Sequence, residues 1–374
     1  MSNLDTTLGV RVLLWLGDPI PTPQPPEVTE ALLSADVTQT DDGDGFQLVF
    51  ALSQDGLLGF PQLVDPATAI FSSVVIAVLV GASFQVLING VITHHQIDPH
   101  PEPGRSTLTL SGRDVSVMMD LEDRSASFPN MPDFVIVTQI LASYPQLGLI
   151  PVVTPTTDIP IFLQRIPRQA ETDLQFIRRL AKRNGYVFHI NPTLPGVNQA
   201  VFAPELRDSL PQSMLAINTI TSDNVTSLHF TNDGLAQVGV TDSSAFIEPI
   251  SKSVFPIPEL PSLRLPPLVV NPTPSKRKDQ LRESANETPS RAFLSSVAKV
   301  TGAPEPVTGT GEVDTSRYGS VMMARGLIGV RGVSAYDGFY YLRQVTHHLE
   351  VGKYTQSFVI TREGTESISP VVVP

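Results

Sequence analysis

The segment over residues 169–190 constrains the fold more than any other part of the chain, because the start, buried face and end of a helix are all encoded within it. Thr172 followed by Gln175 is a capping-box pattern, which marks where a helix begins. Gly185 can adopt the left-handed conformation that ends one. The spacing predicts a helix over 172–184 whose apolar stripe is made of Leu174, Ile177, Leu180 and Ala181.

The residues after this helix, 186–190, are aromatic or β-branched and predict a strand. Basic residues gather around the helix. They form either a solvated face balanced by Glu171 and Asp173 or a contact with an acidic neighbouring subunit. On the second interpretation, the candidate subunit-contact residues are Arg168, Arg178, Arg179, Lys182 and Arg183.

The composition narrows the class of protein. The chain has 374 residues, no cysteine and a formal net charge of −12. Its length allows two or three domains, and the missing cysteines exclude disulfides and thiolate metal sites. The negative charge argues against non-specific nucleic-acid binding as the main role, and no specific nucleic acid is expected as a partner. We expect no secretory signal, because the N-terminus lacks a basic region.

The apolar run over 67–82 is too short and too β-branched for a membrane helix, and a buried strand pair is predicted instead.

Alternating apolar and polar residues predict a β-rich region at each end of the chain. In residues 1–120 we expect strands, with a hairpin turn over 41–45. Between the two regions a helix is predicted over 134–144. Further strands are predicted over 10–16, 28–40, 46–53, 70–80, 83–97, 105–110, 200–203, 214–220, 225–240, 318–333, 339–349 and 354–362.

Residues 246–274 differ from the rest of the chain in composition. Eight prolines in 29 residues alternate with Ile, Leu and Val. Proline removes backbone donors, so the segment cannot lie inside a sheet. We expect an extended arm that packs on a surface, followed by a short helix that ends at Gly302.

A search for catalytic and metal-binding patterns yields no catalytic residue, no cofactor-binding residue and no metal ligand. Residues 309–311, a Gly-Thr-Gly run, are expected to form a loop, since the third glycine of a nucleotide-binding motif is missing. The acidic turn at 41–44 lacks the glutamate of a calcium loop. The pairs His94–His95 and His347–His348 each point to opposite faces of a strand, so neither pair can bind one ion alone.

Several motifs together resemble the tail hub family, which includes the late control gene D proteins of contractile phages and the N-terminal part of VgrG spikes. The sequence QAETDLQFIRRLAKRNGY at 169–186 resembles the signature helix of that family. Four further stretches agree with it in order: GVIT at 90–93, LSGRD at 110–114, MPDFVI at 131–136, and the closing hairpin from Asp337 to Phe358.

The resemblance implies a mixed α+β, mainly β fold. It implies two tube-like β-barrel domains, a small α/β connecting domain and the Pro-rich arm. The first tube-like domain would span 1–120, and the second tube-like domain would combine 200–245 with 303–366. The connecting domain would span 121–199, and the arm with the short helix 246–302.

The resemblance also implies a function. Three chains would form a ring that adapts a threefold spike to a sixfold inner tube. The implied partners are two further copies of the chain, the spike, tube proteins and baseplate wedge proteins. The location would be a phage tail or tail-like particle made in the bacterial cytoplasm, with no integral membrane segment and no enzymatic activity. Two other classes stay open from the residues alone: a baseplate-associated cell-wall hydrolase and a β-rich receptor-binding protein.

Overall fold

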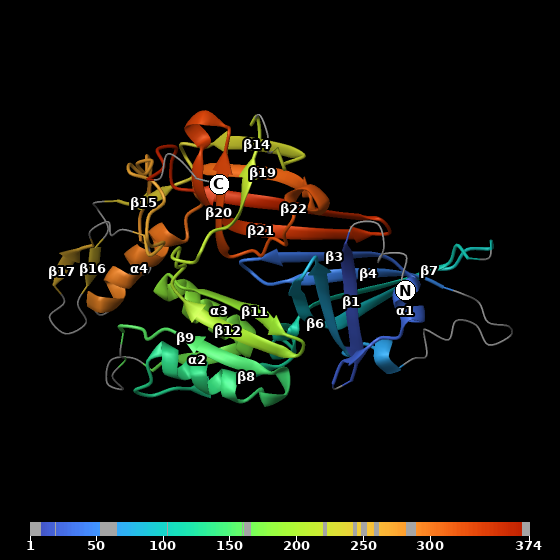
Figure 1. Ribbon diagram of the computed structural model, residues 1–374. Coiled ribbons are helices and arrows are strands. Elements are labelled where there is room, and N and C mark those ends of the chain that lie inside the picture. Colours follow the sequence, from blue (N-terminus) through green and yellow to red (C-terminus); the bar gives the residue numbers. More distant parts are fainter. Residues whose placement is uncertain are drawn as a thin grey trace.

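The computed structural model describes residues 9–368, apart from 19, 53–65, 103, 159, 161–165, 220–222, 242–244, 248–252, 258–261 and 282–288. The protein is mainly β, as predicted (Figure 1). Most strands belong to one 13-stranded sheet. Its strands are β1 (Val10–Gly17), β2 (Thr22–Pro23), β3 (Leu32–Thr40), β4 (Gly45–Ala51), β5 (Ser73–Val80), β6 (Ser83–Asp98), β7 (Thr107–Asp114), β13 (Gln212–Ala216), β14 (Ser227–Asn232), β19 (Val307–Asp314), β20 (Gly326–Arg331), β21 (Gly338–Glu350) and β22 (Lys353–Arg362).

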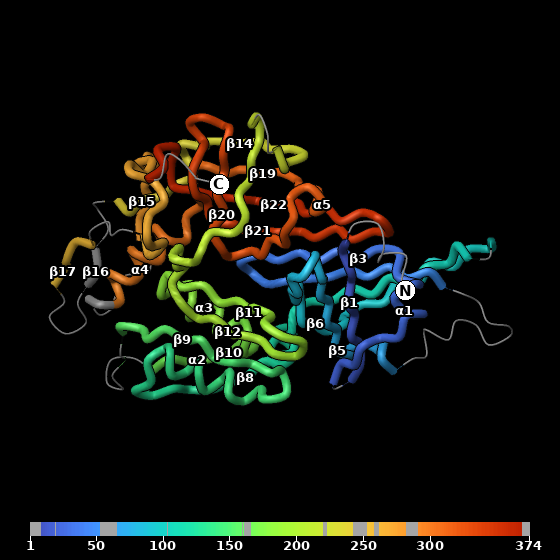
Figure 2. Tube along the Cα trace, viewed as in Figure 1, coloured from blue at the N-terminus to red at the C-terminus, as the bar shows by residue number. Residues whose placement is uncertain are grey.

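This sheet unites the two ends of the chain. Its order is β14-β19-β22-β21-β3-β4-β7-β6-β5-β1-β2, with β20 beside β21 and β13 beside β20. β3 and β21 therefore lie side by side although they are far apart in sequence, as the blue and red tubes of Figure 2 show. Within the described ranges the strand order stays open and closes into no barrel, whereas the resemblance implied two barrels.

A smaller unit, formed by the residues between the two β-rich regions of the sequence, lies against the sheet (Figure 1). It contains two helices and two small sheets, which enclose a core of their own around Ile136, Phe176 and Phe202. Its elements are β8 (Asp123–Ser127), α2 (Asp133–Ala142), β9 (Leu149–Val153), β10 (Arg168–Thr172), α3 (Asp173–Asn184), β11 (Val187–Leu194) and β12 (Val197–Ala203).

Helix α3 forms where its sequence predicts. The Thr172 hydroxyl accepts a hydrogen bond from the Gln175 amide at 3.3 Å, and Gly185 ends the helix at φ +67°. The capping box is only half made, because the Gln175 side chain donates to Asp120 instead of to the helix start. All four predicted stripe residues are buried. The buried Phe176 joins them and stacks on Phe128.

The arm and a group of short elements lie beside the C-terminal half of the sheet. They are β15 (Val238–Val240), β16 (Ala245–Ile247), β17 (Val254–Pro256), β18 (Arg277–Asp279) and α4 (Pro289–Thr301). The described part of the arm contacts its own chain: Leu268 and Val269 are buried, and Val269 bridges to Ser367.

Four local predictions were wrong. The strand predicted over 28–40 starts only at Leu32, because Pro26 opens the short helix α1 (Pro26–Glu30). The strand over 225–240 is split into β14 and β15. The region 318–333 starts with the end of α5 (Thr315–Tyr318), and β20 covers only its second half.

The fourth concerns residues 309–311, which lie inside β19 and form no loop. The two glycines let neighbouring rings approach closely. A Cβ on Gly309 would come within 2.7 Å of Phe230, and one on Gly311 within 2.6 Å of Phe358.

The predicted buried strand pair is confirmed for β5 and β6. Val74, Ile76 and Val78 of β5 point into the core of the N-terminal half. No helix in the described ranges is long and apolar enough to cross a membrane.

A buried ion pair holds the two helices of the smaller unit together. Asp133, fully buried at the start of α2, accepts from Arg183 Nε at 2.8 Å and from Asn184 Nδ2 at 2.6 Å, both at the end of α3. Removing the carboxylate leaves a mostly buried guanidinium without its partner. Asp133→Ala should therefore lower the free energy of unfolding by about 3 kcal/mol in urea denaturation.

The matched control is Glu171→Ala, which breaks the more exposed pair of Glu171 with Arg179. Its cost should stay below about 1 kcal/mol. Equal losses for the two variants would contradict the special role of the Asp133 pair.

Candidate functional site: the open face and the sheet junction

The junction between the two halves of the sheet is an antiparallel pairing of β3 with β21. The paired residues run from Gln344 opposite Thr40 to Glu350 opposite Ser34. Directly opposite residues project from the same face of a sheet. The pairing therefore makes the faces of the two halves continuous.

One face of this continuous sheet carries polar residues in rows that follow the strand register. We call it the open face and define it by two rows of residues without an apolar side chain; beyond Arg113 the first row continues on β6 with the buried Val91, and Thr355 of the second row is buried. The first row is Ser227, Glu312, Ser357, Thr346, Thr38, Gly45 and Arg113. The second is Asp314, Thr355, His348, Asp36, Gln47, Ser111 and His94.

Polar side chains of the open face bond to one another across the junction. The hydroxyls of Thr38 and Thr346 lie 3.2 Å apart. His348 Nδ1 lies 2.7 Å from an oxygen of Asp36, and its Nε2 lies 3.0 Å from the Ser357 hydroxyl. These contacts join β3, β21 and β22 without any apolar packing.

The Asp-His-Ser connectivity has the order of a hydrolytic triad, but the three residues stand on neighbouring strands of a sheet face. Acyl transfer requires hydrogen-bond donors that stabilise the developing oxyanion beside the serine. Among the contacts of the described residues, no such donor accompanies these three side chains. The arrangement fits a polar network on the surface of the sheet.

The opposite face at the junction is buried. His347 points inward with no exposed surface while His348 points outward, which confirms the prediction for this pair. His347 Nδ1 lies 2.9 Å from the Tyr354 hydroxyl. Burial, with a smaller effect of the neighbouring His348, lowers the pKa of His347 to about 3, so the imidazole is neutral at pH 7.

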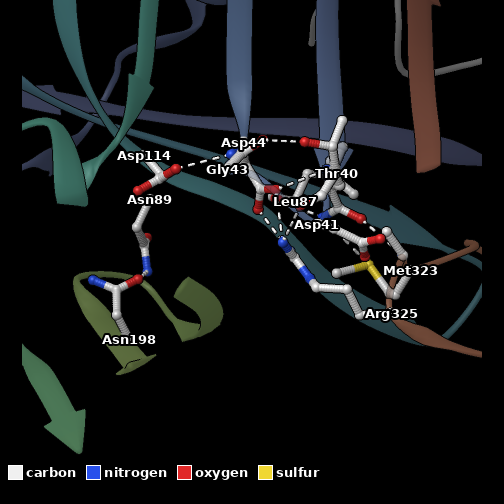
Figure 3. Close-up of polar contacts among 12 residues, drawn as sticks. Thr40, Asp41, Gly43, Asp44, Leu87, Asn89, Asp114, Asn198, Met323 and Arg325 are labelled. Atoms are coloured by element: carbon white, nitrogen blue, oxygen red, sulfur yellow. Dashed lines mark hydrogen bonds and ion pairs between the residues drawn. The ribbon is translucent and has the colours of Figure 1, made fainter. Parts of the chain in front are cut away.

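The turn after β3 is built around a buried acid (Figure 3). Asp44 receives two hydrogen bonds from the Arg325 guanidinium, at 3.0 and 2.8 Å, and one from the Thr40 amide. Burial raises the pKa of Asp44 to about 6, and the Arg325 charge opposes that rise. Asp114 accepts from the Asp44 amide at 2.8 Å. The acidic turn is thus a hairpin, as predicted, and it also ties the two halves of the sheet together.

Of the five candidate subunit-contact residues, three have partners within the chain. Arg183 pairs with Asp133, Arg179 with Glu171, and Arg178 donates to the Asp42 carbonyl. Arg168 and Lys182 are exposed. The contact with an acidic neighbour therefore stays a prediction; Lys182 and Arg183 line a groove.

Sequence reasoning did not find the open face or Arg325. The alternation in β3 and β21 was visible in the sequence, but the register that aligns their polar residues was not. Arg325 falls inside the strand predicted over 318–333, but it lies just before β20 and adopts φ +66°, for which the sequence gives no signal.

No family model and no curated protein matches the sequence, so the comparison rests on structure. The chain shares its fold, over nearly its full length, with phage tail proteins. A tail protein from Neisseria meningitidis MC58 aligns with a TM-score of 0.59 at 16% identity, covering 96% of this chain and 98% of that one. The 43 kDa tail protein of prophage MuSo2 from Shewanella oneidensis aligns with a TM-score of 0.61 at 12% identity, covering 95% and 98%.

A component of the Escherichia coli type VI secretion system, which is similar in structure to the T4 tail proteins gp27 and gp5, has the same fold. It aligns with a TM-score of 0.56 at 13% identity, covering 92% of this chain and 77% of that chain. These likenesses confirm the resemblance to phage tail proteins and the mainly β fold, whereas the described strands close into no barrel.

The buried His347 predicts how stability depends on pH. Its pKa is lower in the folded chain than the usual 6.5, so an unfolded chain binds the proton first as pH falls. Protonation of this histidine in the unfolded chain should lower the free energy of unfolding by up to about 1.4 kcal/mol per pH unit below pH 6.5. In His347→Gln, the free energy of unfolding should fall less steeply between pH 6.5 and 5 than in the parent, as measured by urea denaturation.

Tyr354→Phe is the matched control. It removes the hydroxyl beside His347 but keeps the imidazole buried, and burial is the main cause of the shift. Its pH slope should match that of the parent. A parent and a His347→Gln variant with the same slope would show that the imidazole ionises without penalty.

Proposed function

We propose that this chain is the structural baseplate hub of a contractile phage tail or a tail-like injection system. In this proposal three copies form a ring that joins a threefold spike to the sixfold inner tube. The chain carries no catalytic role, and its partners are the spike, tube and wedge proteins of the particle. The continuous open face carries the proposal, because a passage through such a ring needs a wall without apolar patches.

The strand order supports two equivalent halves. Reading outward from the junction, β21, β22, β19 and β14 repeat the pairing of β3, β4, β7 and β6. Every neighbouring pair in both series is antiparallel. Two such halves in each of three chains would present six similar units to a sixfold tube.

The domain limits follow from this proposal. The tube-like units would be residues 1–120 and residues 200–245 with 303–366, while 121–199 would connect them. The open sheet of each half would curve to form part of the ring wall, and neighbouring copies would complete it. The shared fold with phage tail proteins supports this reading.

We propose that the arm, residues 246–274, contacts a neighbouring subunit through those side chains that point away from its own chain. The arm is anchored inward by Leu268, and by Arg264, which pairs with the buried Glu205 at 3.4 Å. Val270 points outward and is 63% exposed, and Leu265 is also exposed. An apolar side chain held outward on an anchored segment is suited to a partner surface.

The ring is tested with single cysteines, since the chain has none. Gln47→Cys and Ser227→Cys lie on the open face, in opposite halves of the sheet. After labelling with maleimide gold, purified oligomers should have three times the chain mass by mass photometry. Electron micrographs should show gold from both variants at the central opening. A monomer, or gold at the outer rim, would contradict the proposal.

Val270→Asp tests the arm without disturbing its anchors. The substitution places a charge on an exposed side chain, so the thermal midpoint should stay close to that of the parent. Assembly of complete particles, counted by electron microscopy after complementation, should fall severalfold. Val351→Asp, at an exposed turn residue away from the arm, is the matched control. Normal assembly of the Val270→Asp variant would remove the arm from the interface.

A further inference from the structure

A groove of about 1020 Å³ lies between the last turn of α3, one side of α4 and the strand β18. The two helices approach each other closely there, since a Cβ on Gly185 would lie 3.4 Å from the Ala298 backbone. Figure 1 shows α3, α4 and β15 gathered at this side of the molecule. The groove lies beside the arm, where the Leu263 amide donates to the Thr301 hydroxyl, and none of its lining residues belongs to the two rows of the open face.

The lining of the groove is strongly basic. Among the residues that the structure describes, six cations and one acid, Asp279, border it. The chain as a whole has 25 Lys and Arg against 37 Asp and Glu, so almost a quarter of its cations meet at this place. The six cations are Lys182, Arg183, Arg277, Lys278, Arg291 and Lys299.

The stability of the fold explains only some of these charges. Lys182, Arg183 and Lys299 stand in last helical turns, where cations are favoured. Arg277 and Lys278 lie on a strand and gain nothing from a helix end. Arg291 stands in the first turn of α4, where a cation is disfavoured by that helix, but its Nη1 donates to the Arg183 carbonyl at the end of α3 at 3.5 Å. Arg277 pairs with Asp279 of its own strand.

The acids nearby offset only part of the positive charge. Asp279 lies 2.8 Å from Lys299 and 3.6 Å from Arg277, and Arg183 is bound to Asp133. Arg277 is still 62% exposed, and Lys182 and Lys278 are exposed as well. Apolar side chains, including Val238 and Leu281, complete the lining.

We propose that this groove docks an extended acidic segment of a partner protein. Carboxylates of the segment would pair with the exposed cations, and its uncharged residues would cover the apolar lining. The charge of the groove complements such a segment and is opposite to that of most of the chain.

The surroundings favour a polypeptide over a nucleic acid. A second cavity of about 630 Å³ continues from the groove and shares Lys182, Ala298 and Gly302 with it. Asp41, Asp42 and Glu205 line that cavity together with Arg178, Arg264 and Arg343, so its charge is mixed. A nucleic acid carries a phosphate at every step and would meet these acids. A peptide can place neutral residues beside them.

The test uses a fluorescein-labelled peptide of alternating glutamate and alanine, with fluorescence anisotropy as the readout. The full-length protein should bind this peptide, more weakly as salt rises, and should not bind the matching lysine–alanine peptide. The double variant R277E/K278E should bind it at least about tenfold more weakly. Because both side chains are exposed, its circular dichroism spectrum should match that of the parent.

Lys353→Glu, which changes the charge of an exposed residue on β22 outside the groove, is the matched control and should keep the affinity of the parent. Three results would overturn the proposal. They are no binding by the parent at low salt, an equal loss in R277E/K278E and Lys353→Glu, and binding of an oligothymidine in preference to the acidic peptide.

Discussion

The pairing of β3 with β21 is the interaction on which the rest of the structure depends. Seven residue pairs join two sheets that come from opposite ends of the chain. A slip by one residue would exchange the buried and exposed faces of the whole strand. The register is fixed by the buried Gln39, whose amide donates to the Leu87 carbonyl at 2.8 Å and accepts from the Ala324 amide at 3.1 Å. Turning Gln39 outward would leave both backbone groups unsatisfied.

Charged groups reinforce this junction from within. Arg325 crosses from the C-terminal half to Asp44 in the N-terminal half. Nearby, the fully buried Arg207 binds Glu205, Glu305 and Glu363 at 2.6 to 2.8 Å. Buried ions are costly unless every partner is present, so such groups add specificity more than stability. They permit few alternative ways of docking the two halves and the arm.

The sequence predicted those elements whose signals are local. Thr172 and Gly185 mark the ends of α3, and period-two alternation marks β21. The open face depends on the register between distant strands, which no local signal carries. Asp36 and His348 are separated by most of the chain, yet they meet at 2.7 Å. The loop predicted over 309–311 was wrong for the same reason. Glycine usually indicates a loop, but here Gly309 and Gly311 make room for Phe230 and Phe358 from neighbouring strands.

The open face and the basic groove differ in what they can offer a partner. On the open face, Thr38 bonds to Thr346 and Asp36 bonds to His348. These polar groups are already satisfied, so they offer few hydrogen bonds to another molecule. In the groove, Arg277 and Lys278 project from a short strand and keep their charge exposed. Electrostatic attraction of this kind draws in and orients a partner. In the two proposals the same chain would present a polar wall at the open face and an attachment point at the groove. Thr40 and Gln344, the first pair of the β3–β21 register, line the cavity that continues from the groove.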